Sequence, residues 1–451
     1  MKTVLALAGF AVVLVAVPWW RGGVAVSGFE KLDAAIAEAS QGRMVSTTTV
    51  ERGVLRSFAT TQLGAVGDES GDASESSIQV RHTIFHGPLP IGELLHGRPP
   101  RGLSQALVET EILLPSIDPD RVIATVTTQV DWSGLTRVEL DAPAYEHDIP
   151  SIRWSGAKGS LVASDVEFER VSGYIEMPGL EVSFGENEAS IEDIFMDVDA
   201  EPSAIEGLAL GAGSVSVGRM HVSTPDQQFE LTGLRWGQRA EVDAEAETYS
   251  STFRTDLEAF ALAGDDYGPG AFELVMRNLD LKALGELQAL ANTPPSEELD
   301  AEAAEGRAMD QFLQILTQSP ELEITELSFT SPDGTLQGTG QARIDGESPA
   351  LAMGVLGAMG ALSAEADLLF PPRLFHKLLD QMLANQLAEP TSTFSVEAAA
   401  MRSEWLDRLL SAGYIQLTPD GYRVRIEFAG GGLRLNGLPA DPTLLAPMQG
   451  A

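Results

Sequence analysis

The chain of 451 residues contains no cysteine. This absence excludes a disulfide framework, a thiolate metal site and a cysteine nucleophile together. A protein without cysteine is compatible with either side of a membrane, so the absence does not assign the chain to a compartment.

Positive charge is also scarce. Lys and Arg number 29 against 66 Asp and Glu, which gives a formal net charge of −37. The resulting negative field repels phosphate backbones and excludes nucleic acid as a partner. Only five of the basic residues are lysine, and a Lys-poor, Ala- and Gly-rich chain is typical of a bacterium with a GC-rich genome. Solubility or adaptation to salt explains the charge better than a site for cationic ligands.

Histidines and known catalytic patterns are few as well. The chain has six histidines, and no H-E-x-x-H, G-x-S-x-G or Walker sequence occurs. Only His82 and His86 have a spacing at which two side chains of one strand could reach the same ion. No nearby carboxylate completes that set, so a structural pair beside a turn is favoured over a metal site. The sequence predicts no metal, no cofactor and no enzymatic activity.

Long apolar runs are missing, with one exception at the N-terminus. Thr3 to Trp20 carries no charge and extends over about 18 residues, near the lower limit for crossing a bilayer. Trp19 and Trp20 stand where an aromatic belt would lie. A cleavable signal peptide is the alternative, but the Trp pair occupies the place of a small-residue cleavage site. Residues 1–21 are therefore predicted to be an uncleaved membrane anchor, although the charges at its two ends nearly balance and leave its orientation open.

What the chain does have is a two-residue alternation of apolar and polar side chains. The alternation is clearest from Val122 to Trp132 and returns in short runs from Leu161 to Met276. This pattern is typical of antiparallel hairpins with one buried face. Ser/Thr-Pro-Asp follows a strand-like run at 224–226, 331–333 and 418–420, which indicates a repeated strand–turn–strand unit.

Apolar side chains at helical spacing mark a smaller number of helices. The clearest lie in 279–290, 303–318, 371–387 and 403–412. The predicted fold class is α+β, with an N-terminal membrane anchor followed by tandem, mostly antiparallel β-sheets and helices packed on one face. The predicted parts are the anchor (1–21), an N-terminal α+β part (22–150), a β-rich middle part (151–291), an acidic Pro-rich joint (292–306) and a C-terminal α+β part (307–451).

The most distinctive local sequence runs from Ile84 to Pro90, where a strand meets a turn. Glycine and then proline stop the strand, because proline fixes φ and has no N–H to donate. The motif residues are His86, Gly87, Pro88, Leu89 and Pro90. The backbone explains the glycine and both prolines, so a structural corner is favoured over an active site. The role of His86 stays open.

A second unusual stretch, Pro349 to Leu362, carries no charge over 14 residues. It is too short to span a bilayer but could dip into one or line a lipid groove. A buried connection between sheet and helix is the competing interpretation and the more favoured of the two. The residues that would contact lipid are Met353, Val355, Leu356, Met359 and Leu362.

With these features in order, the chain resembles the YdgA-like family of uncharacterised bacterial envelope proteins. The resemblance rests on the N-terminal apolar segment, the motif His86 to Pro90, the β-rich middle and the ending, where Gly413-Tyr414-Ile415 precedes Tyr422 to Phe428 and Gly431 to Gly437. It covers nearly the whole chain, while the acidic loop 68–77 and the low lysine content depart from it. It implies a single-pass inner-membrane protein with its bulk in the periplasm, and it implies no activity, cofactor or catalytic residue.

Two functional hypotheses follow. The first is a membrane-anchored periplasmic envelope protein that is not an enzyme and binds or scaffolds lipid or another envelope protein, with acyl chains sheltered by a twisted sheet. The second is a hydrolase acting on cell-envelope material, with His82, His86 and a carboxylate in a closed pocket. A continuous apolar groove would favour the first. A homo-oligomer is compatible with either.

Overall fold

The computed structural model describes residues 44–51, 56–65, 78–86, 104–115, 118–131, 133–148, 151–164, 170–203, 205, 208–225, 227–262, 264–292, 301–386 and 394–441. Contacts between residues divide the chain into two units. Unit 1 contains Met1–Pro202 and Val215–Pro225, and unit 2 contains Ser203–Ser214 and Asp226–Ala451. Strand β12 (Ala209–Ser223) contributes residues to both units.

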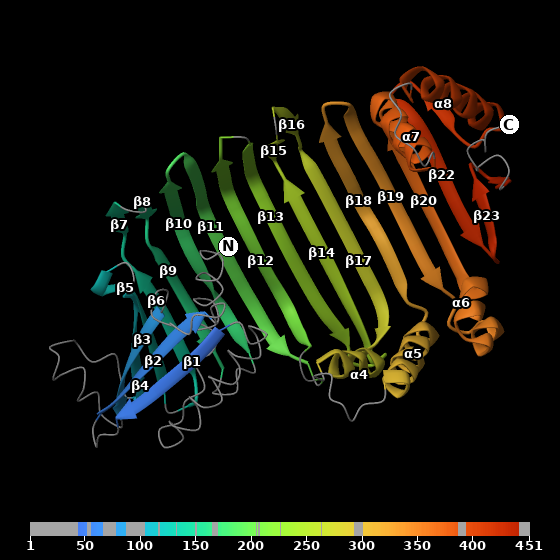
Figure 1. The fold of residues 1–451 in the computed structure, drawn as a ribbon. Helices are drawn as coiled ribbons and strands as arrows, with labels where there is room; N and C mark the ends of the chain where they lie inside the picture. The colour runs from blue at the N-terminus through green and yellow to red at the C-terminus, as the bar shows by residue number, and fades with distance from the viewer. Residues whose placement is uncertain are drawn as a thin grey trace. The chain divides into compact units, whose positions relative to one another are not determined.

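Unit 1 is an antiparallel meander in which each strand from β1 to β6 pairs with the next (Figure 1). Strand β6 pairs with β9 and β7 with β8, so these four form one interrupted hairpin. Strand β10 then pairs with β9 and β8 and with β11. The strands are β1 (Met44–Glu51), β2 (Arg56–Ala65), β3 (Ile78–His86), β4 (Ser104–Leu114), β5 (Asp118–Asp131), β6 (Thr136–Ala142), β7 (Tyr145–Asp148), β8 (Ser151–Trp154), β9 (Ala157–Ala163), β10 (Val171–Phe184) and β11 (Asn187–Pro202).

The alternation of the sequence places one face of unit 1 in a core. In β6 the side chains alternate strictly between buried and exposed, beginning and ending with a buried residue. Because successive side chains of a strand point to opposite faces, this pattern selects a single register for the sheet. The central cluster consists of Leu63, Val80, Ile112, Ala124, Val126, Val138, Leu140, Ala142, Ala157 and Met177.

The strands of unit 2 are also antiparallel, and neighbouring strands follow the order β13–β14–β17–β18–β19–β20–β22. Short strands extend it: β15 pairs with β13 and β16, β21 and β23 pair with β22, and β24 pairs with β23. The strands are β13 (Gln228–Asp243), β14 (Thr248–Leu257), β15 (Ala259–Leu262), β16 (Asp265–Tyr267), β17 (Gly270–Asp280), β18 (Glu321–Ser331), β19 (Gly334–Ile344), β20 (Leu362–Phe370), β21 (Gln416–Thr418), β22 (Gly421–Ala429), β23 (Gly432–Leu435) and β24 (Leu438–Pro439).

Two turns of unit 2 show what the repeated Ser/Thr-Pro-Asp sequence does. Each is followed by glycine and closes a hairpin, β18–β19 at Gly334 and β21–β22 at Gly421. The hydroxyl of Ser331 donates to the carbonyl oxygen of Gly334 at 3.1 Å, and the hydroxyl of Thr418 donates to that of Gly421 at 2.9 Å. Both glycines have positive φ, 117° and 146°, which disfavours any side chain there. The repeated unit is thus a hairpin turn with a hydroxyl that closes it.

The helices of unit 2 lie at the ends of its strands (Figure 1). Two connections are at one end: α4 (Leu281–Asn292) and α5 (Ala301–Thr317) join β17 to β18, and the 3-10 helix η1 (Pro349–Met353) and α6 (Val355–Ala361) join β19 to β20. At the opposite end, α7 (Pro372–Gln386) and α8 (Phe394–Ser411) follow β20. The helical connections of unit 2 that the structure describes therefore lie at the strand ends.

A compact core holds α7 and α8 against the end of the sheet. The ring of Phe375 in α7 lies 5.4 Å from that of Phe370 and 5.0 Å from that of Tyr422, centroid to centroid. The buried members of this core are Phe375, Leu379, Trp405, Leu406, Leu409, Tyr414, Ile415, Tyr422 and Leu435. The wide apolar stripe of α7 is thus buried at its Phe375 and Leu379 positions, against side chains of α8 and β22.

The structure confirms the mostly antiparallel β-sheet with a few helices that the alternation predicts. Among the residues it describes, no helix is both long enough and apolar enough to cross a membrane. The predicted anchor (1–21) and Gly87 to Pro90 lie outside the described residues. From Ala301 onward the predicted acidic joint is the start of α5, and the predicted division into parts stays a prediction.

Candidate functional site

One face of the unit 2 sheet is apolar across its width, and we call it the apolar face. Between β17 and β18, and again between β20 and β22, apolar residues lie directly opposite one another in successive rows. Directly opposed side chains project from the same face of a sheet. The large members of the apolar face are Trp236, Phe253, Phe272, Leu274, Met276, Leu322, Ile324, Leu327, Phe329, Leu336, Ile344, Leu362, Leu368, Phe370, Tyr422, Val424, Ile426 and Phe428.

The apolar face is only half buried along most of its length. Trp236 and Leu322 are each 41% exposed, and the apolar side chains of β17 are intermediate from Phe272 to Met276. In unit 1, by contrast, Leu63 and Val80 of the core are 1% exposed. A face with the composition of a core but without its burial is the kind of surface that marks a binding site.

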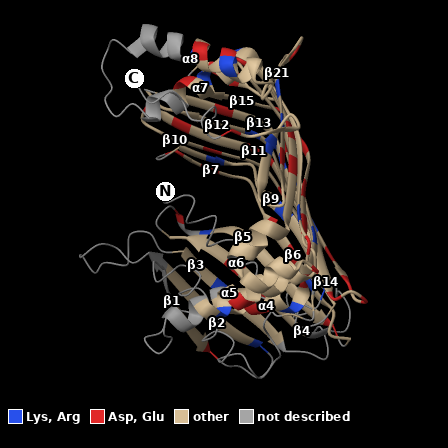
Figure 2. Cartoon of the chain, turned by 90° about the vertical axis from the view of Figure 1, so that its right-hand side faces the viewer, with Lys and Arg blue, Asp and Glu red and all other residues tan. Residues whose placement is uncertain are grey.

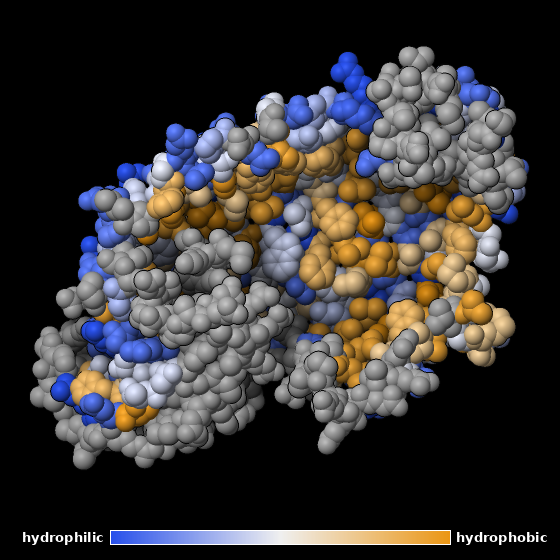
Figure 3. All heavy atoms as spheres, viewed as in Figure 1, coloured by the Kyte–Doolittle hydropathy of each residue, from blue (hydrophilic) through white to orange (hydrophobic). Residues whose placement is uncertain are grey.

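The shape of this face is visible from two sides. In Figure 2, α7 and the group α4–α6 project on the same side of the unit 2 strands. Figure 3 shows apolar side chains gathered over the strands between these two groups of helices, in a hollowed part of the surface. The arrangement is an open apolar trough, floored by strands and bounded by helices at the strand ends.

Aromatic rings gather at one end of the trough. Phe260 of β15 stacks on Tyr267 of β16 with 4.5 Å between ring centroids. Both rings lie 6.2 Å from Phe329 of the apolar face. Stacked rings offer a wide, rigid apolar surface with little conformational entropy to lose on binding.

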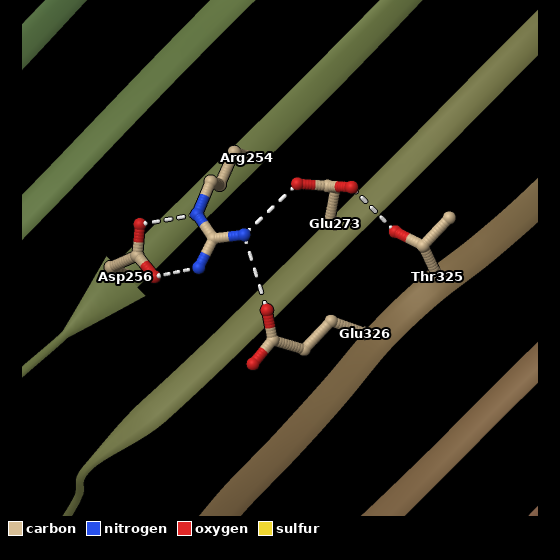
Figure 4. A network of polar contacts seen from close by, with 5 residues as sticks. All are labelled: Arg254, Asp256, Glu273, Thr325 and Glu326. Atoms are coloured by element: carbon tan, nitrogen blue, oxygen red, sulfur yellow. Dashed lines mark hydrogen bonds and ion pairs between the residues drawn. The ribbon is translucent and has the colours of Figure 1, made fainter.

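The opposite face of the same sheet is a network of ion pairs (Figure 4). Arg254 binds both carboxylate oxygens of Asp256 at 2.8 Å, and its Nη1 lies 2.9 Å from Glu273 and 3.1 Å from Glu326. The hydroxyl of Thr325 donates to Glu273 at 2.6 Å. The hydrogen bond from Thr325, with that from Arg254, holds the pKa of Glu273 below its usual range.

Further ion pairs continue this polar face toward β22. Arg277 pairs with Glu323 at 2.6 Å, and Arg423 donates two hydrogen bonds to Asp367 at 2.8 and 2.5 Å. The bond from Arg423 lowers the pKa of the Asp367 carboxyl. Carboxylates held ionised in this way on an open, solvated surface are poor general acids. The ion pairs of the polar face join neighbouring strands, which supports their register.

The uncharged stretch Pro349 to Leu362 forms a second apolar surface. Met353 is 71% exposed, Leu356 85% and Met359 51%. We call these three side chains the α6 tip. Leu362, the first residue of β20, is partly buried, and Val355 begins α6. Ala358 and Ala361 are buried, so the small side chains of α6 hold it in place while the large ones project into solvent.

The predicted histidine pair lies on β3 in unit 1. His82 is 4% exposed, and its Nδ1 lies 2.9 Å from the hydroxyl oxygen of Thr110. Burial lowers the pKa of His82 to about 4, so the imidazole is neutral at pH 7. His86 ends β3 opposite Ala106. No group of three His, Asp or Glu side chains in the described ranges could hold a metal ion.

The sequence did not predict that this apolar face is partly exposed. Antiparallel hairpins with one buried face were predicted for the alternating runs from Leu161 to Met276, which include β13, β14 and β17. The alternation shows which side chains share a face, but it carries no information on whether another layer covers that face. The position of the helical stretches, each confined to the end of a strand, was the signal that could have revealed the open middle.

Comparison with known proteins identifies the family but no function. The model of the family "Bacterial protein of unknown function (DUF945)" matches residues 1–443, nearly the whole chain, so the chain belongs to this family. The match confirms the resemblance to an uncharacterised bacterial family. No curated protein and no solved structure matches the chain.

Proposed function

We propose that this DUF945 protein is anchored in the inner membrane with its bulk in the periplasm, and that it binds the acyl chains of lipids on the apolar face of unit 2 without acting as an enzyme. The observation that supports acyl-chain binding is the apolar face itself, which extends from β13 to β22 and keeps Trp236 and Leu322 41% exposed. The anchor and the location rest on the uncharged run from Thr3 to Trp20 and on the family resemblance.

Acyl chains suit this surface for energetic reasons. Each methylene that a bound chain removes from water contributes about 0.8 kcal/mol, so even a partly covered chain can offset the entropy of being held. The trough offers rows of aliphatic and aromatic side chains, with the charged network on the opposite face of the sheet. Binding would then depend on the length of an apolar chain more than on the identity of its headgroup.

The alternative function, a hydrolase acting on envelope material, has weaker support. It needs His82, His86 and a carboxylate together in one pocket. His82 is 4% exposed inside unit 1, with its Nδ1 2.9 Å from the hydroxyl oxygen of Thr110, where a bulky envelope substrate would not reach it. We therefore retain the binding module as the proposal.

Native mass spectrometry of the detergent-extracted full chain tests the proposal. We expect lipid to remain bound to the wild-type protein, and Leu322→Glu to lower the bound fraction by about tenfold, because a carboxylate on the apolar face opposes burial of a chain. Leu322 is already partly exposed, so this variant should fold.

Phe184→Glu supplies the matched control, since Phe184 is an exposed apolar residue at the end of β10 in unit 1. It should leave lipid occupancy unchanged. A wild-type spectrum that contains only the lipid-free chain would contradict the proposal, as would equal losses in the two variants.

A further inference from the structure

We infer that the α6 tip inserts into a lipid bilayer whose surface is neutral or zwitterionic, and so provides a second membrane contact far along the sequence from the anchor. The inference rests on the proposed function in one respect, namely that the proposed anchor keeps the chain close to a membrane. The observations that support it concern the α6 tip and not the apolar face.

The packing of η1 against α6 presents the three large side chains of the tip to solvent. Gly354, with φ of 69°, joins η1 to α6, and the side chain of Ser348 caps the start of η1 by accepting from the N–H of Ala350. The two helices touch at Gly357, where an added Cβ would lie only 1.7 Å from the carbonyl oxygen of Ala350. This close packing sets how η1 and α6 lie against each other, and in that arrangement Met353 and Leu356 are 71% and 85% exposed.

The size of the tip favours a bilayer over a protein partner. A stable protein interface buries about 800 Å² on each partner and about 20–30 residues a side. The tip offers three large side chains on two short helices, which falls well below that area. Insertion among lipids needs no complementary shape, and flexible methionine side chains adapt to such surroundings.

The charge around the tip decides which bilayer it suits. No lysine or arginine occurs between Arg343 and Arg373, whereas Asp345 and Glu347 directly precede the tip. Interfacial helices that bind anionic lipids carry Lys and Arg on their polar side. With carboxylates there instead, the tip gains nothing from anionic headgroups, so its contact with the membrane is apolar alone.

Site-specific labelling of the full chain in vesicles tests this inference. Because the protein has no cysteine, Leu356→Cys creates a single site for an environment-sensitive fluorophore such as NBD. In phosphatidylcholine vesicles we expect blue-shifted emission, and loss of more than half of it when the lipids carry a nitroxide in their acyl chains. Phe184→Cys, at a residue 70% exposed in unit 1, should show neither effect.

A double variant and a change of lipid composition test the two parts of the inference separately. Adding Met353→Asp and Met359→Asp to the labelled chain should abolish the quenching, and replacing half of the phosphatidylcholine by phosphatidylglycerol should not increase it. Equal responses at positions 356 and 184, or a stronger response with phosphatidylglycerol, would overturn the inference. Lipid occupancy in native mass spectra should stay unchanged in the Met353→Asp, Met359→Asp variant, which separates failure of the tip from failure of the apolar face.

Discussion

At the scale of single residues, His82 has the largest pKa shift of any histidine that the structure describes. Its imidazole lies within the sheet of unit 1, opposite Thr110 on one neighbouring strand and Ala59 on the other. Burial favours the neutral form and lowers the pKa from 6.5 to about 4. His82 therefore links the stability of unit 1 to pH, whatever the function of the protein.

Stability should fall as the pH drops from about 6.5 to about 4. In that window the unfolded chain binds a proton at His82 and the folded chain does not, so protonation favours unfolding, by about 3 kcal/mol in total for a shift of this size. Urea unfolding at pH 7 and at pH 4.5 measures the effect. His82→Gln should remove much of this pH dependence, whereas Thr110→Val should keep it; identical pH profiles for wild type and His82→Gln would contradict the assignment.

At the scale of elements, glycines at the hairpin turns of unit 2 are fixed by contact as well as by conformation. A Cβ at Gly421 would lie 2.1 Å from the carbonyl oxygen of Phe370, at a φ of 146°. Gly430 also has positive φ, 57°, but nothing lies within 4 Å of its Cβ position. The two sites therefore separate the effect of crowding from that of the backbone.

Gly421→Ala should destabilise unit 2 by at least roughly 1–3 kcal/mol, since strain in φ adds to the clash with β20. Gly430→Asn should be near neutral, because asparagine tolerates the left-handed conformation and has open space here. Thermal unfolding of both variants measures the two losses of stability. A smaller loss at Gly421 than at Gly430 would show that the turn is not held as the structure has it.

The sequence predicted strands where apolar and polar side chains alternate, from Val122 to Trp132 and in runs from Leu161 to Met276, and it predicted helices only where an apolar stripe was present. Helix α8 begins at Phe394, whereas the predicted helix began at Ser403. The added turns contain Ala398 to Ala400, which favour a helix but form no stripe. Strand β4 begins at Ser104, in a segment that pairs with both β3 and β5, and these pairings come from residues distant in the sequence.

The candidate site was predictable only in part, because exposure depends on packing between segments and not on the local sequence pattern. The lack of charge identified Pro349 to Leu362, while a buried connection was the favoured interpretation. The exposure of Met353, Leu356 and Met359 depends on how η1 packs on α6, which a sequence pattern does not encode. The partial exposure of the apolar face depends on what packs against it, and periodicity carries no information on that.

At the scale of the whole molecule, the net charge bears on whether two copies associate through their apolar faces. The net charge of −37 makes two copies of the chain repel each other, and in unit 2 many of the carboxylates line the face opposite the trough. Repulsion of this size opposes pairing of two apolar faces. Neutral apolar chains carry no such penalty, which favours lipid over a second copy as the occupant.

Photo-crosslinking with a phospholipid that carries a diazirine in its acyl chain tests acyl-chain binding most directly. The full chain would be reconstituted with this lipid, irradiated, digested and analysed by mass spectrometry. The account predicts crosslinks to side chains of the apolar face in β17, β18 and β20, such as Phe272, Leu327 and Leu368. Crosslinks confined to the N-terminal segment, or spread equally over the face that carries Arg254 and Arg423, would contradict it.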